Sequence, residues 1–540
     1  MELTRARAGN DRGGNARGGN DRGGNARGGN ARGGNARGEN DRGESARGQS
    51  DRDLNGCLLA RFSGPVLPDW LRRWLDEGLA GVVLFAGNIT GPEQLRSLVR
   101  GLREHSPDLL IAVDEEGGIV TRLEAASGSS YPGNAALGAV DDVALTGRIA
   151  TSIGATLAAS GLSLDLAPVA DLDSNSASPV IGVRSFGSDP DRVAAHTAAF
   201  VAGVQASMVA ACAKHFPGHG RASADSHLEL PSVRATLDQL RSTDLVPFRA
   251  AIAAGVRSVM TAHVVFPAID DVPATLSARL LGPVLRGELG FDGVIVTDAL
   301  DMSAIGDDEQ GAAGAVRALA AGADLLCLPA GEAAQRTARR SLAAAFRAGE
   351  LARGQVAAAA DRVRALAAWA RPTPAAEPDP AMGATVASLA LLLDGPVGPL
   401  STPPYVLDAG GRMSTQLEDS AASLLGVLRS MLPGTDGIRM AGPQDATGPA
   451  RDRALAAAAG RPLVIAVRDA QRSGWQRELL SQALAARPDA IVVGTGTVHD
   501  RPLAGQAYLG TRGSSRASLT AAASLLAGRN RERAGSGTDA

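Results

Sequence analysis

The sequence of 540 residues has few cysteines, a single lysine and no long apolar segment. The three cysteines, Cys57, Cys212 and Cys327, lack metal-ligand spacing and are odd in number, so we expect buried, reduced thiols. No run of 18 or more apolar residues occurs, which argues against a membrane-spanning helix. The cytoplasm is therefore the expected location.

Several common catalytic motifs are also absent. The chain has no glycine-rich phosphate loop, no G-x-S-x-G nucleophile elbow and no H-E-x-x-H zinc motif. The formal net charge is −3, which argues against nucleic acid as the main partner. Three of the seven histidines and the only lysine lie together in "KHFPGHGRASADSHLEL", at residues 214–230. This loop is where we expect the chemistry.

Residues 1–53 repeat a pentad of the type "ARGGN" and contain almost no apolar side chains. Such a segment cannot bury a core, so we expect it to be disordered. One alternative is a tail that touches RNA or acidic surfaces. Another is upstream sequence translated from a misplaced start codon, in which case a corrected start would leave export open.

From residue 54 onward, short apolar runs alternate with helix-like segments rich in Ala, Leu and Arg. Such alternation indicates parallel βα units, and eight of them predict a (β/α)₈ barrel of the TIM type. The predicted strands are 57–63, 81–88, 109–116, 162–171, 208–215, 257–264, 293–300 and 323–329.

Polar or ionisable residues end many of these predicted strands. In a (β/α)₈ barrel the carboxyl ends of the strands meet on one rim, where active sites lie. The residues in question are Asn88, Asp114, Asp171, Lys214 with His215, His263 and Asp298.

A Pro-rich linker, "RPTPAAEPDPAM", precedes three further apolar runs at 403–410, 462–470 and 489–497. These alternate with helical segments such as 473–487 and predict a smaller three-layer αβα domain. The expected organisation is a tail at 1–53, a catalytic barrel at 54–370, a linker at 371–382 and a C-terminal domain at 383–530.

Four motifs carry a family resemblance: "VDEEGGIVTR", "VIGVRSFG", "KHFPGHGRASADSH" and "GFDGVIVTDALDM". Together, and in this order, they resemble glycoside hydrolase family 3, in particular its β-N-acetylglucosaminidases that act on cell-wall fragments. The resemblance extends over about residues 56–530. It implies an enzyme that acts on a small carbohydrate.

By this resemblance, Asp298 in "VTDAL" matches the family's nucleophile. A carboxylate there can form a covalent glycosyl ester; the alternative is a helix-capping Asp. The subgroup usually has an acidic residue where this chain has Ala299, and Asp301 is a weaker candidate for the nucleophile.

His227, with Asp225 as partner, matches the general acid/base, since an imidazole can donate and later accept a proton near neutral pH. The alternative is a solvent-exposed loop histidine.

The resemblance also places Asp114, Arg122, Arg184, Lys214 and His215 at substrate-binding positions. For either arginine the alternative is a surface ion pair. A compact ammonium can donate to sugar hydroxyls in a crowded pocket where a planar guanidinium does not fit. This explains a lysine in a chain that otherwise uses arginine.

Four nearby residues carry weaker expectations. Glu115 and Glu116 are adjacent, so at most one can face the pocket. His219 is more consistent with a structural than a catalytic role, and His263 with either a structural or a site-adjacent one.

We therefore expect a retaining exo-β-N-acetylglucosaminidase that releases terminal non-reducing N-acetylglucosamine from peptidoglycan-type fragments and needs no metal or organic cofactor. Alternatives are a β-glucosidase of the same family, a phosphorylase in which phosphate replaces water, and a sugar-binding protein without turnover. The oligomeric state stays open.

Overall fold

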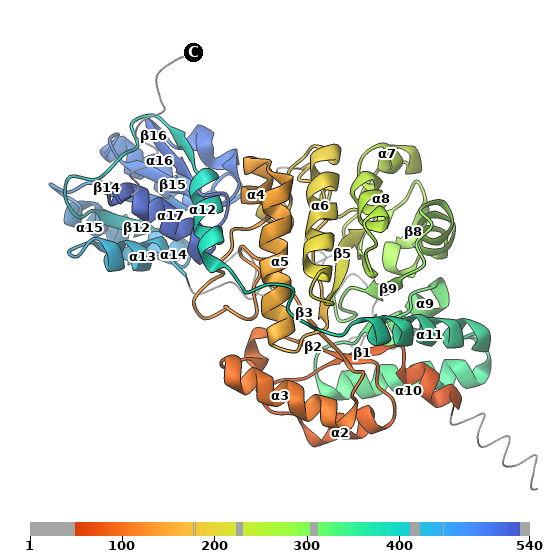
Figure 1. Ribbon diagram of the computed structural model, residues 1–540. Coiled ribbons are helices and arrows are strands. Elements are labelled where there is room, and N and C mark those ends of the chain that lie inside the picture. Colours follow the sequence, from red (N-terminus) through yellow and green to blue (C-terminus); the bar gives the residue numbers. More distant parts are fainter. Residues whose placement is uncertain are drawn as a thin grey trace, which may run out of the picture. The chain divides into compact units, whose positions relative to one another are not determined.

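The computed structural model describes most of the chain beyond the pentad tail (Figure 1). The expectation of a disordered tail falls almost wholly outside the described residues. No described helix is both long and apolar enough to cross a membrane. All three cysteines are buried and reduced, as predicted. The described ranges are 49–175, 178, 180–222, 230–302, 312–410, 422–446 and 448–529.

Eight parallel strands form the first sheet; seven lie within a predicted run, and β5 exceeds its run, 208–215, by one residue. A bridge between Val296 and Leu325 joins the two ends of the sheet, which therefore closes into a barrel. In spatial order the strands are β10 (Leu326–Cys327), β1 (Leu58–Arg61), β2 (Gly81–Leu84), β3 (Leu110–Val113), β4 (Leu164–Asp165), β5 (Ala210–Phe216), β6 (Ser258–Thr261) and β9 (Val294–Thr297).

Helices cover the outside of this barrel. They are α2 (Asp69–Asp76), α3 (Pro92–His105), α4 (Asn134–Val140), α5 (Val143–Ala159), α6 (Pro190–Gln205), α7 (Leu237–Ser242), α8 (Leu245–Ala253), the π-helix η4 (Leu280–Glu288), α9 (Ala312–Ala321), α10 (Glu332–Ala348) and α11 (Arg353–Trp369). The loops add a hairpin and three 3₁₀ turns: β7 (Val265–Phe266), β8 (Asp270–Pro273), η1 (Ala86–Asn88), η2 (Gly182–Arg184) and η3 (Ala274–Leu276).

Alternation along each strand divides the apolar side chains between two cores. Val83 and Ala112 belong to the cluster inside the barrel, whereas Val82 and Ile111 pack outward against the helices. Strands buried on both faces explain why the sequence shows continuous apolar runs rather than alternation of apolar and polar residues.

The second sheet belongs to a three-layer αβα arrangement, as predicted. Its strands lie in the order β11 (Leu392–Asp394), β16 (Ala507–Gly510), β15 (Ile491–Gly494), β14 (Leu463–Val467), β12 (Tyr405–Asp408) and β13 (Asp436–Arg439), and only β11 is antiparallel to its neighbour. Separate apolar cores lie on its two faces. Its helical segments are α12 (Pro380–Leu389), α13 (Leu424–Met431), α14 (Pro443–Ala446), α15 (Gly448–Ala457), α16 (Gly474–Ala486), the 3₁₀ helix η6 (Val498–Leu503) and α17 (Arg516–Leu526).

A loop of the barrel contacts the αβα domain that contains the second sheet, called the second unit below. Arg516, the first residue of α17, donates to Glu124 Oε1 (2.7 Å) and to the carbonyl of Gly128 (3.2 Å). Gly383 of α12 lies so close to the carbonyl of Ser130 that a Cβ would stand 2.0 Å from the oxygen. The domain boundaries given above stay a prediction.

Candidate active site

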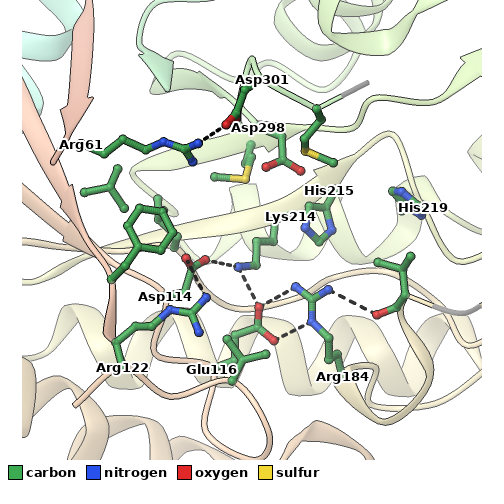
Figure 2. A pocket seen from close by; sticks show the side chains of 17 residues that line it. Arg61, Asp114, Glu116, Arg122, Arg184, Lys214, His215, His219, Asp298 and Asp301 are labelled. Atoms are coloured by element: carbon green, nitrogen blue, oxygen red, sulfur yellow. Dashed lines mark hydrogen bonds and ion pairs between the residues drawn. The ribbon is translucent and has the colours of Figure 1, made fainter. Parts of the chain in front are cut away.

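A cavity opens where the barrel strands end, and eight of the 17 residues that line it are charged (Figure 2). Among the described residues the lining includes four cations and four carboxylates, whose formal charges cancel. They are Arg61, Arg122, Arg184, Lys214, Asp114, Glu116, Asp298 and Asp301.

The strands place these side chains by a simple rule. Ala112, Cys212 and Val296 point into the barrel core. Side chains in a strand alternate between faces, so residues two positions further on point the same way. That rule brings Asp114 and Lys214 to one cavity, and Asp298 follows Val296 in the same manner.

Lys214 lies at the centre of the charged network. Its Nζ donates to Asp114 Oδ1 at 2.8 Å and is 2.7 Å from Glu116 Oε1. Arg184 binds Glu116 with two hydrogen bonds, of 2.9 Å and 2.7 Å. Arg122 Nη2 lies 3.6 Å from Asp114 Oδ2. Figure 2 shows these contacts as a continuous chain from Arg122 to Arg184.

Burial makes the network depend on its pairing. Burial raises the pKa of Glu116, but the charges of Arg184 and Lys214 outweigh it and hold this pKa well below its usual range. The same balance lowers the pKa of Asp114, because Lys214 and Arg122 offset its burial. Burial alone would lower the pKa of Lys214, yet the two carboxylates raise it. All of these groups are therefore charged at neutral pH, and removing one leaves another buried charge uncompensated.

His215 is held from behind by a buried carboxylate. Its Nδ1 lies 2.7 Å from Asp171 Oδ2, and Asp171 Oδ1 accepts the backbone N–H of His219 at 2.7 Å. Burial raises the pKa of Asp171, but the His215 ring outweighs it and the pKa is lowered. Nδ1 thus faces Asp171, and the ring of His215 lines the cavity.

His219 also lines the cavity, with its ring 5.9 Å from that of His215 in an edge-on arrangement. Burial lowers the pKa of His219 to about 4, so its ring is neutral at physiological pH.

Asp298 follows β9 directly and precedes a turn that the Met302 N–H closes on the Ala299 carbonyl; residues 298–302 are called the Asp298 turn below. Its Oδ1 accepts the backbone N–H of Ala299 at 2.7 Å. Asp301, three residues on, forms an ion pair with Arg61 and accepts the backbone N–H of Ala330 at 3.0 Å. Arg61 and Asp298 thus approach the cavity from the ends of β1 and β9, and Figure 2 shows Asp298 beside Asp301.

The structure brings six of the eight predicted site residues to this one cavity. The other two, His227 and Asp225, lie outside the described residues, so their roles stay predictions. The six are Asp114, Arg122, Arg184, Lys214, His215 and Asp298.

Sequence reasoning overlooked two charged lining residues. For Glu115 and Glu116 the sequence indicated only that at most one of them faces the pocket. Glu116 lines the cavity, whereas Glu115 accepts the backbone N–H groups of Arg122 and Leu123. Arg61 ends a strand in which Leu59 faces inward, so the two-residue alternation could have identified it. Asn88 is absent from the lining and instead donates to the carbonyls of Phe62 and Gly64.

Comparison with known proteins places the barrel in a characterised group. Residues 69–366 match the model of the glycosyl hydrolase family 3 N terminal domain. A beta-hexosaminidase of Pseudomonas aeruginosa is 43% identical over 251 residues, which cover 46% of this chain and 74% of that protein. One from Stenotrophomonas maltophilia is 41% identical over 309 residues, covering 55% and 91% respectively.

A solved structure is similar to most of the chain. It is a glycoside hydrolase family 3 beta-N-acetylglucosaminidase from Paenibacillus sp. str. FPU-7, with 31% identity and a TM-score of 0.81. The similarity covers 89% of this chain and 96% of that one, so it includes the second sheet.

Proposed function

Because the chain belongs to glycosyl hydrolase family 3, we propose that it is a retaining exo-β-N-acetylglucosaminidase acting on peptidoglycan-type fragments. The chain is a glycoside hydrolase, and relatives with 41% and 43% identity support β-N-acetylhexosaminidase activity. The identity of the sugar, the retaining course of the reaction and the identity of the acid/base residue go beyond what these relatives support.

One observation supports it most: a carboxylate, Asp298, shares a cavity with a fully paired network of buried charges. The charges of the described lining residues cancel, which suits a neutral, polyhydroxylated ring better than an ion. Lys214 and the two arginines offer donors, and Asp114 and Glu116 offer acceptors, the equipment needed to hold hydroxyl groups.

In the proposed reaction, an Asp298 oxygen attacks the anomeric carbon. The bond from that carbon to the leaving oxygen breaks, and His227 supplies the proton that this oxygen takes up. His227, oriented by Asp225, then removes a proton from water, which attacks the same carbon and releases Asp298. Asp114, Arg122, Arg184, Lys214 and His215 hold the sugar meanwhile.

The first test compares release of a chromogenic phenol from an aryl β-N-acetylglucosaminide and from the matching β-glucoside, in phosphate-free buffer. We expect the acetamido sugar to be preferred and Asp298→Ala to abolish turnover. Asp292→Ala is the matched control, since Asp292 is exposed near the opposite end of β9. His227→Ala should cost about 10²- to 10⁴-fold with a poor leaving group and much less with a dinitrophenol.

Other outcomes would change the proposal in defined ways. Preference for the glucoside would overturn the sugar but keep the nucleophile. Acceleration by phosphate, with the sugar 1-phosphate as product, would indicate a phosphorylase. Sugar binding without turnover would favour a binding protein.

A further inference from the structure

We propose that His263 and Asp301 are positioning residues that hold the Asp298 turn from two sides and so fix the orientation of the Asp298 carboxylate. The inference rests on the proposed role of Asp298 as nucleophile. Neither residue is needed as a direct contact to the sugar for this role.

His263 reaches the turn from the segment directly after β6. It is fully buried and absent from the cavity lining. Its Nε2 lies 3.0 Å from the carbonyl oxygen of Ala299, the residue directly after Asp298. A carbonyl can only accept, so Nε2 carries the proton and donates. On the other side of the ring, Nδ1 lies 2.7 Å from Thr275 Oγ1, which fixes the ring plane.

Asp301 holds the other end of the turn. Its carboxylate binds Arg61, the last residue of β1, and the backbone N–H of Ala330 in the segment after β10. Arg61 is itself fixed, because the Gln335 amide of α10 donates to its carbonyl at 2.6 Å and its guanidinium lies 5.4 Å from the centre of the Phe85 ring. Asp301 therefore ties its own turn to the end of β1 and to the segment after β10.

The turn has further anchors in its backbone. Leu300 N–H donates to the carbonyl of Cys327 at 3.1 Å, and Met302 N–H donates to the carbonyl of Ala299 at 3.2 Å. With His263 on Ala299 and Arg61 on Asp301, contacts from the segment after β6, from β1 and from β10 converge on residues 298–302. This geometry suits a nucleophile, since displacement of the attacking oxygen by about 1 Å can cost about 10²-fold in rate.

The ion pair also gives Asp301 a role other than that of a second nucleophile. A carboxylate already bound to a guanidinium and to a backbone N–H is a poor nucleophile, because both donors stabilise its charge. Asp301 is thus a poor candidate for attack.

The test compares His263→Gln with His263→Leu. Glutamine can still donate to the Ala299 carbonyl, whereas leucine cannot. We expect kcat/KM for the aryl glycoside to fall about 10- to 100-fold in His263→Leu and to stay close to wild type in His263→Gln. The inhibition constant of free N-acetylglucosamine, which reports sugar binding, should be almost unchanged in both.

His196→Leu is the matched control. His196 is equally buried, in α6, and its ring also has two partners, Thr146 and Asp141. Both leucine variants should lower the unfolding temperature, but only His263→Leu should lower kcat/KM. Equal kcat/KM for the two leucine variants would overturn the proposal, as would an equal loss in His263→Gln.

Asp301→Asn and Asp301→Ala supply an independent check. Asparagine keeps acceptors for Ala330 and Arg61, so we expect kcat/KM to rank wild type, Asn, then Ala, again with little change in sugar binding. An Ala variant as active as wild type would overturn the role of Asp301. If the wild-type enzyme prefers the glucoside, the proposed sugar is wrong, but the same variants still test whether His263 and Asp301 position Asp298. If the wild-type enzyme turns over neither sugar, both the proposed function and this inference are overturned.

Discussion

Glu115 and Glu116 are neighbours in the chain, yet their carboxyl groups lie in opposite electrostatic environments. Burial raises the pKa of Glu115 to about 7, and its main partners are backbone N–H groups. Glu116 is equally buried, but two cations hold its pKa low. The sequence predicts that the two side chains diverge, because adjacent residues point apart. It does not predict which one meets Arg184 and Lys214, since those partners are 68 and 98 positions away.

This contrast predicts opposite effects of two isosteric substitutions. Because the folded-state pKa of Glu115 is above its ordinary value of 4.5, the folded state keeps a proton that the unfolded chain releases, and stability falls as pH rises from about 4.5 to 7. Glu115→Gln should remove this loss and stabilise the protein at pH 8 by about 1–3 kcal/mol, with little effect at pH 4. Thermal unfolding across this pH range measures it.

Glu116→Gln is the contrasting variant. It leaves Arg184 and Lys214 short of a buried counter-charge, so it should destabilise by about 3–5 kcal/mol at neutral pH. Because the folded-state pKa of Glu116 is lowered, the stability it contributes is fully present above its ordinary value of 4.5. Parallel pH profiles for the two variants would contradict the electrostatic picture.

At the scale of elements, sequence reasoning identified the strands that are buried on both faces. All eight barrel strands and the central strands β12, β14 and β15 lie in continuous apolar runs. It missed β16, which is also buried and has a neighbour on each side, and the two edge strands β11 and β13. β13 reads "DGIR", is largely exposed and ends the sheet, and β11 has only three residues. Strands of this kind depend on pairing with a neighbour more than on their own apolar pattern.

The helix pair α5 and α6 offers a test at this scale, and the two run side by side in Figure 1. A Cβ on Gly203 of α6 would stand 2.5 Å from the carbonyl oxygen of Gly147 and 2.6 Å from Ala150 Cβ. Gly203→Ala should therefore force the helices apart and destabilise by about 1–3 kcal/mol.

Gly147→Ala is its control, because a Cβ there meets nothing closer than 3.8 Å. Alanine favours a helix over glycine, so this variant should stabilise by about 0.5–1 kcal/mol. Denaturant unfolding of both variants gives the comparison. A stabilising Gly203→Ala would show that the helices are not packed as tightly as described.

At the scale of the whole molecule, α12 and α17 of the second unit hold one barrel loop. The close approach of Gly383 to Ser130 leaves no room for a side chain. Gly383→Ala should loosen this contact and lower the unfolding temperature of the second sheet domain more than that of the barrel. Differential scanning calorimetry measures it, with Gly354→Ala as the control, since a Cβ on Gly354 meets nothing within 4 Å. Equal shifts of both transitions would contradict it.

The two-residue alternation that aims Asp114, Lys214 and Asp298 at one cavity also sets which changes in chain length the protein can absorb. Deleting one residue inside β3, β5 or β9 would turn the cavity-lining side chain at its end toward the helices, even if the strand still paired. The same deletion in a surface loop on the far side of the barrel would shift no site residue. Length variation among homologues should therefore be excluded from these short strands and concentrated in the connections between them.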